Sequence, residues 1–223
     1  MSAGSDLDAK LAALRLEYAR AGLMEGDVAP TPLAQLERWL GDAVTAGVRE
    51  ANAFTLATAS PDGAPNARIV LVKGFDARGI TFFTNYESAK GRELAANPRA
   101  CAVFFWPELE RQARLFGDIE KVTRAESEAY FHSRPHGSQL GALASNQSEV
   151  VPSREALDAK LADLTATYAE GPIPLPDFWG GYRLLPRSLE LWQGRPNRMH
   201  DRLRYVHASG PADGTWRVER LSP

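Results

Sequence analysis

Residues 53–85, AFTLATASPDGAPNARIVLVKGFDARGITFFTN, contain the pattern that decides the fold class. Three short runs rich in Val, Ile, Phe and Thr are separated by the turn-forming sequence Pro61-Asp62-Gly63-Ala64 and by the segment from Asp76 to Gly79. Runs of this length and composition between Gly, Pro and Asp clusters are typical of strands joined by turns. We therefore predict strands at residues 53–59, 67–73 and 79–84.

The same pattern continues toward the C-terminus. We predict further strands at residues 99–106, 111–122, 182–193, 202–208 and 215–221. Because the strands are short and closely spaced, and helices are inserted between them rather than alternating with them, the sequence favours an antiparallel barrel. The predicted class is mostly β with inserted helices (α+β), in a single domain spanning residues 1–223.

Helical periodicity and capping residues place the predicted helices. One lies at residues 31–47, with Thr31 as N-cap and Pro32 in the first turn. A proline disfavours helical geometry in the residue before it, so the helix at residues 123–133 ends before Pro135. In the helix at 31–47, the residues expected to face inward are Leu33, Leu36, Leu40 and Val44. Three other helices are predicted at residues 6–21, 88–97 and 153–170. The first of these has Leu7, Leu11, Leu14 and Tyr18 on one face, and the last has Leu157, Leu161 and Leu164 on one face.

Composition and charge exclude several classes of protein. Hydrophobic content of 44% and charged content of 24% are ordinary globular values. The net charge of −2 gives no general attraction to nucleic acid or to an anionic membrane. The N-terminal residues MSAGSDLDAK lack an apolar signal core, and no apolar run reaches the roughly 18 residues of a membrane span, so we predict a cytoplasmic protein. The single cysteine, Cys101, excludes an internal disulfide and is expected to be a small buried thiol.

The local distribution of charge and the motifs that are absent limit the kinds of ligand and site that this protein can have. Six arginines lie between Arg183 and Arg204, against only Glu190 and Asp201, which favours a small anionic ligand over a long polyanion; the alternative is a solvated strand face. No Gly-x-Gly, P-loop or Gly-x-Ser-x-Gly sequence is present. His132 and His136 have helical metal-pair spacing, but a proline separates them and no third ligand is evident, so we predict no metal site.

Four segments carry groups suited to phosphates and flat rings. A hydroxyl, a lysine and helix N-terminal amides after the third strand form a plausible phosphate seat. Taken singly, each segment also has a structural reading: an aromatic ring can simply pack, and His200 can be a surface histidine held by Asp201. The four segments are Arg68–Lys73, with a cation at each end; Phe83-Thr84-Asn85 with Ser88-Ala89-Lys90; Tyr130, Arg134 and Ser138 at i, i+4 and i+8; and Trp192-Gln193-Gly194 leading into Arg198-Met199-His200-Asp201-Arg202.

These segments resemble pyridoxamine 5′-phosphate oxidases. The resemblance is collinear from about Leu14 to the C-terminus and rests on RIVLVK (68–73), FFTNYESAKG (82–91), FHSRPHGSQLGA (131–142), FWGGYR (178–183), LWQG (191–194), NRMHDR (197–202) and the ending VERLSP. It implies a homodimeric split β-barrel with FMN in two clefts at the subunit interface. The implied reaction converts pyridoxamine 5′-phosphate and pyridoxine 5′-phosphate to pyridoxal 5′-phosphate with O2 as acceptor, giving H2O2, and ammonia from the amine.

The resemblance also implies roles for individual residues. Residues 1–30 would be a partly mobile N-terminal helical segment, of which Arg15 to Tyr18 can cover the substrate. The implied catalytic residues are Arg198 and His200. The implied FMN contacts are Arg68, Ile69, Val70, Leu71, Val72, Lys73, Phe83, Thr84, Lys90, Gln112, Gln147, Ser148, Trp192 and Arg202, and the implied substrate contacts are Arg15, Tyr18, Lys73, Tyr130, Arg134, Ser138, Arg198, Met199 and His200.

Two residues depart from the family pattern, and other functions stay open. Ala89 stands where many members have arginine, and Leu143 where many have tryptophan. The alternatives are another split-barrel oxidoreductase that uses flavin or deazaflavin, a protein that stores flavin or pyridoxal phosphate, and a nucleic-acid module. The net charge of −2 and the lack of a known basic motif argue against the nucleic-acid module, and we predict neither nucleic acid nor membrane as a partner.

Overall fold

The computed structural model describes residues 8, 11, 18–207 and 215–223. Its strands form one antiparallel sheet in the order β2-β1-β5-β6-β7-β4-β3, with β8 paired to β7 and β9 paired to β8. The mostly-β, antiparallel prediction is confirmed. The strands are β1 (Ala53–Ala59), β2 (Pro65–Leu71), β3 (Gly74–Phe75), β4 (Ile80–Asn85), β5 (Arg99–Trp106), β6 (Arg111–Lys121), β7 (Trp179–Gln193), β8 (Asp201–His207) and β9 (Trp216–Leu221).

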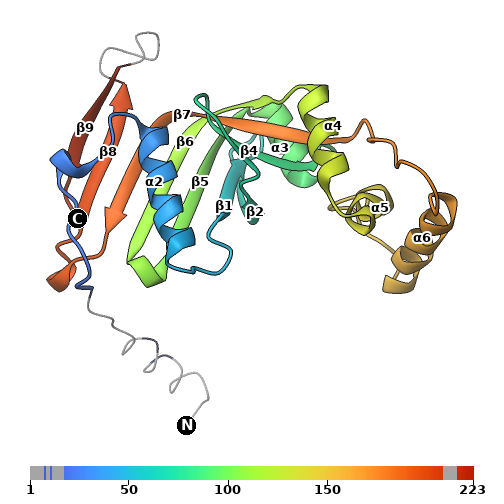
Figure 1. The fold of residues 1–223 in the computed structure, drawn as a ribbon, viewed down its shortest axis with the longest axis horizontal. Coiled ribbons are helices and arrows are strands. Elements are labelled where there is room, and N and C mark those ends of the chain that lie inside the picture. The colour runs from blue at the N-terminus through green and yellow to red at the C-terminus, as the bar shows by residue number, and fades with distance from the viewer. Residues whose placement is uncertain (1–7, 9–10, 12–17, 208–214) are drawn as a thin grey trace.

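The sheet divides at β7, a strand of 15 residues that runs through the sheet from one end to the other (Figure 1). One edge of β7 pairs with β6 along its length. The other edge pairs first with β4, from Trp179 to Leu184, and then with β8, from Ser188 to Gln193. One strand therefore belongs to two diverging half-sheets, which is how the barrel becomes split. The core between them is aromatic: the Phe54 ring centre lies 5.2 Å from that of Phe104.

Helices cover the sheet at two places (Figure 1). The helix α2 packs on β7, and its Trp39 makes an edge contact with Trp106 at the end of β5, with the ring centres 6.4 Å apart. Three other helices gather near the far end of β7. The helices are α2 (Pro32–Thr45), α3 (Ala89–Ala96), α4 (Arg124–Ser133), α5 (His136–Ala144) and α6 (Arg154–Thr167); none in the described part of the chain has the length and apolar character needed to cross a membrane.

Several helix predictions need correction. Thr31 is the N-cap of α2 as predicted, and its side chain accepts a hydrogen bond from Ala34 N. However, Val44 is 63% exposed, because the buried face of α2 runs through Trp39 and Ala43 instead. The predicted helix at residues 6–21 falls mostly outside the described residues; Asp8 and Leu11 are helical, whereas residues 18–21 are not. No leucine of the predicted face of α6 is buried.

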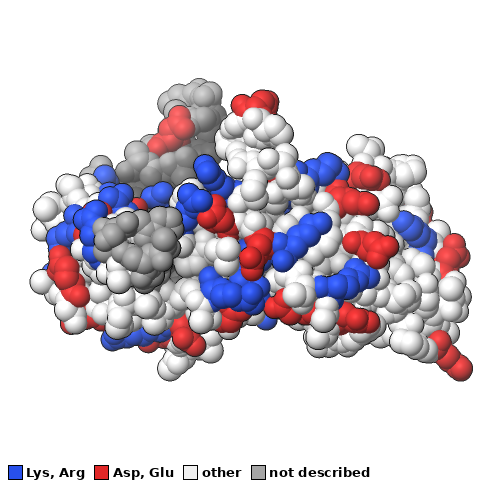
Figure 2. Space-filling model, turned by 90° about the horizontal axis from the view of Figure 1, so that it is seen from above, with Lys and Arg blue, Asp and Glu red and all other residues white. Residues whose placement is uncertain are grey.

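The arginines between positions 183 and 204 do not form one anion-binding cluster. Buried Arg183 pairs with Asp76, Glu120 and Glu126, which come from other elements. Four more arginines also have carboxylate partners within 4 Å: Arg187 with Asp118, Arg195 with Asp201, Arg202 with Glu190 and Arg204 with Glu219. Within the described residues only Arg198 of the six lacks one. Basic and acidic side chains are likewise interspersed on the face shown in Figure 2.

Candidate active site

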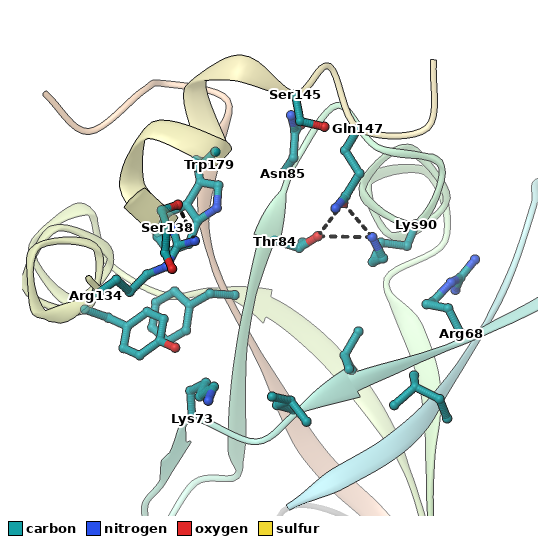
Figure 3. Close-up of a pocket in the computed structure, with 17 residues that line it drawn as sticks. Arg68, Lys73, Thr84, Asn85, Lys90, Arg134, Ser138, Ser145, Gln147 and Trp179 are labelled. Atoms are coloured by element: carbon teal, nitrogen blue, oxygen red, sulfur yellow. Dashed lines mark hydrogen bonds between the residues drawn. The ribbon is translucent and has the colours of Figure 1, made fainter. Parts of the chain in front are cut away.

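A cavity of about 710 Å³ lies between β2, β4, α3, α4 and α5 (Figure 3). It falls within the usual size of small-molecule and cofactor sites. Much of its lining was predicted from sequence. Asn85 belongs to one of the four candidate segments but was given no contact of its own, and Gly141, Ala142, Ser145 and Trp179 were not singled out, although all of these except Ser145 stand inside the quoted motifs. The predicted residues that line the cavity are Arg68, Ile69, Val70, Leu71, Lys73, Phe83, Thr84, Lys90, Tyr130, Arg134, Ser138 and Gln147.

One end of the cavity holds a buried lysine at the start of α3. The Lys90 Nζ donates to Gln147 Oε1 at 2.7 Å and to Thr84 Oγ1 at 3.2 Å, as Figure 3 shows. Ser88 caps α3 by accepting from Gly91 N. Burial, with a smaller contribution from the nearby charge of Arg68, lowers the pKa of Lys90 to about 8. Lys90 is therefore a desolvated cation next to hydroxyls and a helix N-terminus, a combination suited to a phosphate.

A second cation at this end of the cavity, Arg68, is held in place by the carboxylate of Glu93. Arg68 Nη2 lies 3.1 Å from Glu93 Oε2, and its Nη1 donates to Thr58 Oγ1. Glu93 stands on α3, the helix that also carries Lys90, and Asn66 Nδ2 donates to it at 2.9 Å. The contact between β2 and α3 thus sets the position of both cations.

The other end of the cavity has an aromatic wall and an incompletely paired arginine. The Phe83 and Tyr130 rings stack with centres 4.0 Å apart, and the Tyr130 and Trp179 rings are nearly parallel at 6.2 Å. The Arg134 guanidinium carbon lies 4.8 Å from the Trp179 ring centre, and its Nη2 donates to Ser138 O at 2.7 Å. Its Nη1 is buried and has no partner in the described structure. A buried guanidinium nitrogen without an acceptor in the described protein is available to bind an anionic ligand.

Tyr130, Arg134 and Ser138 meet in this wall although no single helix carries them. The helix α4 ends at Ser133, as predicted, and its N-terminus has a capping box between Thr123 and Glu126. The helix α5 then begins at His136 and was not predicted. Backbone hydrogen bonds from Arg134 N to Phe131 O and from Ser138 N to Pro135 O close the joint between the helices.

A separate group of predicted residues lies around the turn between β7 and β8. The Trp192 ring centre is 5.5 Å from that of Tyr18 and 4.7 Å from that of His200. The His200 Nδ1 accepts the Arg195 backbone N–H at 3.1 Å, so neutral His200 carries its proton on Nε2. The interpretation of His200 as held by Asp201 was wrong, because the Asp201 carboxylate accepts from Leu23 N and pairs with Arg220.

Arg198 stands in the same turn with a free side chain. It is exposed, has no hydrogen-bond or ion-pair partner among the described residues, and follows Asn197 in a left-handed backbone, with φ of 55° and 60°. Such a conformation is unfavourable for non-glycine residues and is often retained at functional sites. Arg198 is thus presented by strained backbone rather than by side-chain contacts.

The other predicted residues that the structure describes do not line the cavity either. The Val72 side chain is 8% exposed and packs in the core instead, so it does not line the cavity. The Arg202 guanidinium donates to Glu190 Oε1 and to Ser222 O. Gln112 faces Trp192 across the β6–β7 pair, Ser148 is exposed at φ 75°, Met199 is 67% exposed, and Arg15 lies outside the described residues.

Comparison with known proteins identifies the family. Residues 40–168 match the model of the pyridoxamine 5′-phosphate oxidase family, and residues 179–223 match that of the pyridoxine 5′-phosphate oxidase C-terminal dimerisation region. The chain is 56% identical to a pyridoxine/pyridoxamine 5′-phosphate oxidase of Ralstonia pickettii over 96% of this chain and 99% of that protein. A Burkholderia cenocepacia protein of the same name is 54% identical with the same coverage.

Solved structures agree with this result. PhzG from Burkholderia lata, crystallised with tetrahydrophenazine-1-carboxylic acid, is 33% identical with a TM-score of 0.83, covering 90% of this chain and 98% of that chain. An FMN-binding protein of Nostoc punctiforme shares the fold at 19% identity, with a TM-score of 0.69 over 88% of this chain and 99% of that chain. The cavity, the two family models and the full-length relatives together show that the chain belongs to the pyridoxamine 5′-phosphate oxidase family.

Proposed function

We propose that this protein is an FMN-dependent oxidase that converts pyridoxamine 5′-phosphate and pyridoxine 5′-phosphate to pyridoxal 5′-phosphate. The observation that carries the proposal is the unpaired, buried Nη1 of Arg134 in a cavity that has a second cation, Lys90, among the residues of its other end. Two anion seats at opposite ends of one cavity, one of them beside a wall of parallel aromatic rings, suit two phosphorylated, flat molecules lying side by side.

The residues of the cavity fit FMN. Donors for its phosphate would come from Lys90, Thr84, Gln147 and Arg68. The strand residues 68–71 and Lys73 would line its ring system with apolar side chains and with backbone polar groups. The substrate phosphate would then take the seat formed by Lys73, Tyr130, Arg134 and Ser138. The absence of an arginine at Ala89 leaves Arg68 and Lys90 as the cations of the FMN seat in this chain.

A homodimer accounts for the predicted residues that lie elsewhere. Tyr18, Gln112, Trp192, Arg198, His200 and Arg202 are outside the cavity of their own chain, and β7, β8 and β9 belong to the region that matches a dimerisation model. Exposed apolar side chains on β2, β5 and β6, namely Ile69, Phe105 and Phe116, offer area for such an interface. In the dimer, the turn after β7 of one protomer completes the cavity of the other.

The protein's contribution to the reaction is mainly positional. FMN, when bound, supplies the hydride acceptor and passes the electrons to O2, giving H2O2. Arg134 and its neighbours would fix the substrate by its phosphate and so orient the reacting C4′ carbon. His200, whose Nδ1 is occupied, would donate from Nε2 to an oxygen of the substrate ring, and Arg198 would face the carbon that loses hydride. We also propose that the whole chain acts as one FMN-binding domain in the cytoplasm.

The test is aerobic turnover by purified, FMN-supplemented protein, with pyridoxal 5′-phosphate and H2O2 followed together. Equal formation of both from either phosphorylated vitamer supports the proposal. Bound flavin without product from either would refute it. The second candidate is an oxidase of reduced phenazine carboxylates, favoured by the likeness to PhzG, and tetrahydrophenazine-1-carboxylic acid in the same assay decides between them.

Complementation between two inactive variants tests the shared site. Arg134→Ala damages the cavity of its own chain, and Arg198→Ala damages the group that the chain gives to its partner. In a hybrid dimer one site carries both changes and the other carries neither. Refolding the two variants together at equal amounts is therefore expected to restore about a quarter of wild-type activity, because half of the dimers are hybrids with one intact site. No recovery despite hybrid formation would place both residues in one protomer's site.

Lys90 makes FMN affinity depend on pH. In the free protein its pKa is about 8, so it is charged at neutral pH and loses its charge as the pH rises. A bound phosphate dianion favours the charged form and raises this pKa, so binding takes up a proton above pH 8. We expect the affinity to fall by up to about tenfold per pH unit above that value.

The measurement is FMN fluorescence quenching between pH 7 and 9. Lys90→Met should bind FMN more weakly at pH 7 and lose the steep dependence. Lys121→Met, which removes a lysine that lies over Tyr86 and not in the cavity, is the matched control. An unchanged slope in Lys90→Met would remove Lys90 from the phosphate seat.

A further inference from the structure

Glu110 has an unusual backbone next to the turn that carries Trp192. It follows the short 3-10 turn η2 (Pro107–Leu109) and adopts left-handed φ and ψ of 53° and 39°. Its carbonyl oxygen accepts from Gly194 N at 2.8 Å and from Gln193 Nε2 at 3.2 Å. The strained backbone of Glu110 is therefore tied directly to the Trp192-Gln193-Gly194 segment.

The Glu110 side chain holds a different segment, residues 18–23, which we call the strap. Its Oε2 accepts both the Ala19 N–H at 3.0 Å and the Arg20 N–H at 3.1 Å. At the other end of the strap, Leu23 N donates to Asp201 Oδ2 at 3.1 Å. Hydrogen bonds from amides to a carboxylate are stronger than those between neutral groups. Neighbouring Arg111 does not compete for Glu110, because its guanidinium pairs with Asp42 and Gln193.

The strap places Tyr18 against the two predicted site rings. The Tyr18 ring centre lies 5.5 Å from that of Trp192 and 5.8 Å from that of His200. A Cβ atom on Gly194 would lie 2.6 Å from Tyr18 Cγ, so this packing requires glycine at position 194. Through its side chain and its carbonyl, Glu110 joins residues 19 and 20 of the strap to the segment against which Tyr18 packs.

We propose that Glu110 is a positioning residue that latches the strap, so that Tyr18 forms a fixed wall beside Trp192 and His200. The proposal rests on the proposed function where it assigns His200 to the substrate. Among the described residues, the Glu110 side chain has hydrogen bonds to the strap only, so its effect on the site would pass through the strap. Its loss should therefore loosen Tyr18 while leaving the FMN seat at Lys90 intact.

The rate of trypsin cleavage at the Arg20–Ala21 bond measures how firmly Glu110 holds the strap, and it requires no substrate of the enzyme. Arg20 is exposed, and its amide is one of the two held by Glu110. Glu110→Gly removes the carboxylate and makes the left-handed backbone easier to adopt, so the fold is kept. In the FMN-loaded protein we expect this bond to be cut about tenfold faster or more, as follows from losing two charge-assisted hydrogen bonds. Glu110→Gln, which keeps an oxygen acceptor, should fall between that variant and wild type.

Glu108→Gln is the matched control. Glu108 is an exposed carboxylate of the same turn and has no hydrogen-bond or ion-pair partner within the described residues. Its rate of cleavage at Arg20 should equal that of wild type. The proposal would be overturned if Glu110→Gly were cut after Arg20 at the wild-type rate, or if Glu108→Gln were cut as fast as Glu110→Gly.

A double-mutant cycle with Tyr18→Ala tests the route of action. If Glu110 acts through Tyr18, Glu110→Gly raises KM in the wild-type background and has little further effect once Tyr18 is removed. FMN content should be unchanged in all variants. Additive effects on KM would show that Glu110 acts elsewhere and would overturn the proposal. If the wild type oxidises neither vitamer, the proposed function fails, and the cleavage experiment still decides the latch.

Discussion

Replacing Arg198 with alanine is expected to lower kcat by about 100-fold or more while FMN content stays at the wild-type level. The guanidinium is uncommitted in the free protomer, and the protein accepts two consecutive left-handed residues, Asn197 and Arg198, to present it. A cation aimed at charge that develops during reaction contributes on this scale. Because Arg198 does not line the cavity with Lys90, the FMN seat should be unaffected.

Two further variants separate the side chain from the backbone. Arg198→Gly removes the guanidinium and also relieves the left-handed backbone, so an equal loss of kcat in both variants assigns the effect to the side chain. Arg187→Ala, which removes another partly exposed arginine that pairs with Asp118, serves as the control for general loss of charge. Parallel loss of kcat and FMN content in Arg198→Ala would show instead that Arg198 supports the cofactor or the fold.

The positions of the strands along the chain could be predicted because strand composition and turn-forming residues are local features of the sequence. β1 and β5 have the bounds that were predicted. β7 begins at Trp179, earlier than predicted, because Gly180 and Gly181 weaken the strand signal although both are paired with β4. The helix α5 was missed because Pro135 was interpreted only as the end of the preceding helix, whereas the same proline directly precedes the first residue of α5.

The site was predictable in its chemistry and not in its geometry. Residue type and resemblance were enough to identify Lys90, Arg134 and His200. They do not show that Lys90 and Arg134 line the cavity while His200 lies at the turn between β7 and β8, because this separation depends on how β7 changes partner from β4 to β8. The arginine excess shows the same limit. Arg187 and Arg204 are neutralised by Asp118 and Glu219, which lie on other strands, so charge counted along the sequence did not describe charge in space.

Replacing Gly91 with alanine is expected to destabilise the fold by about 3 kcal/mol or more and to abolish retention of FMN. An added Cβ would lie 2.0 Å from the Tyr86 carbonyl oxygen and 2.4 Å from its carbonyl carbon, and a backbone contact of this kind is relieved only by moving α3. Lys90 precedes Gly91 on α3, so that movement also breaks its hydrogen bonds to Thr84 and Gln147.

Urea unfolding and the flavin absorbance of the purified protein measure the two effects of Gly91→Ala together. Gly41→Ala is the matched control, because Gly41 lies within α2 and a Cβ there meets nothing within 4 Å. Alanine favours a helix over glycine, so this control should be stabilised by up to about 1 kcal/mol. If Gly91→Ala kept wild-type stability but lost FMN, the glycine would serve the phosphate seat alone. If it kept both, the loop at Tyr86 would be free to move, and the position of Lys90 would not depend on the close approach of α3 to that loop.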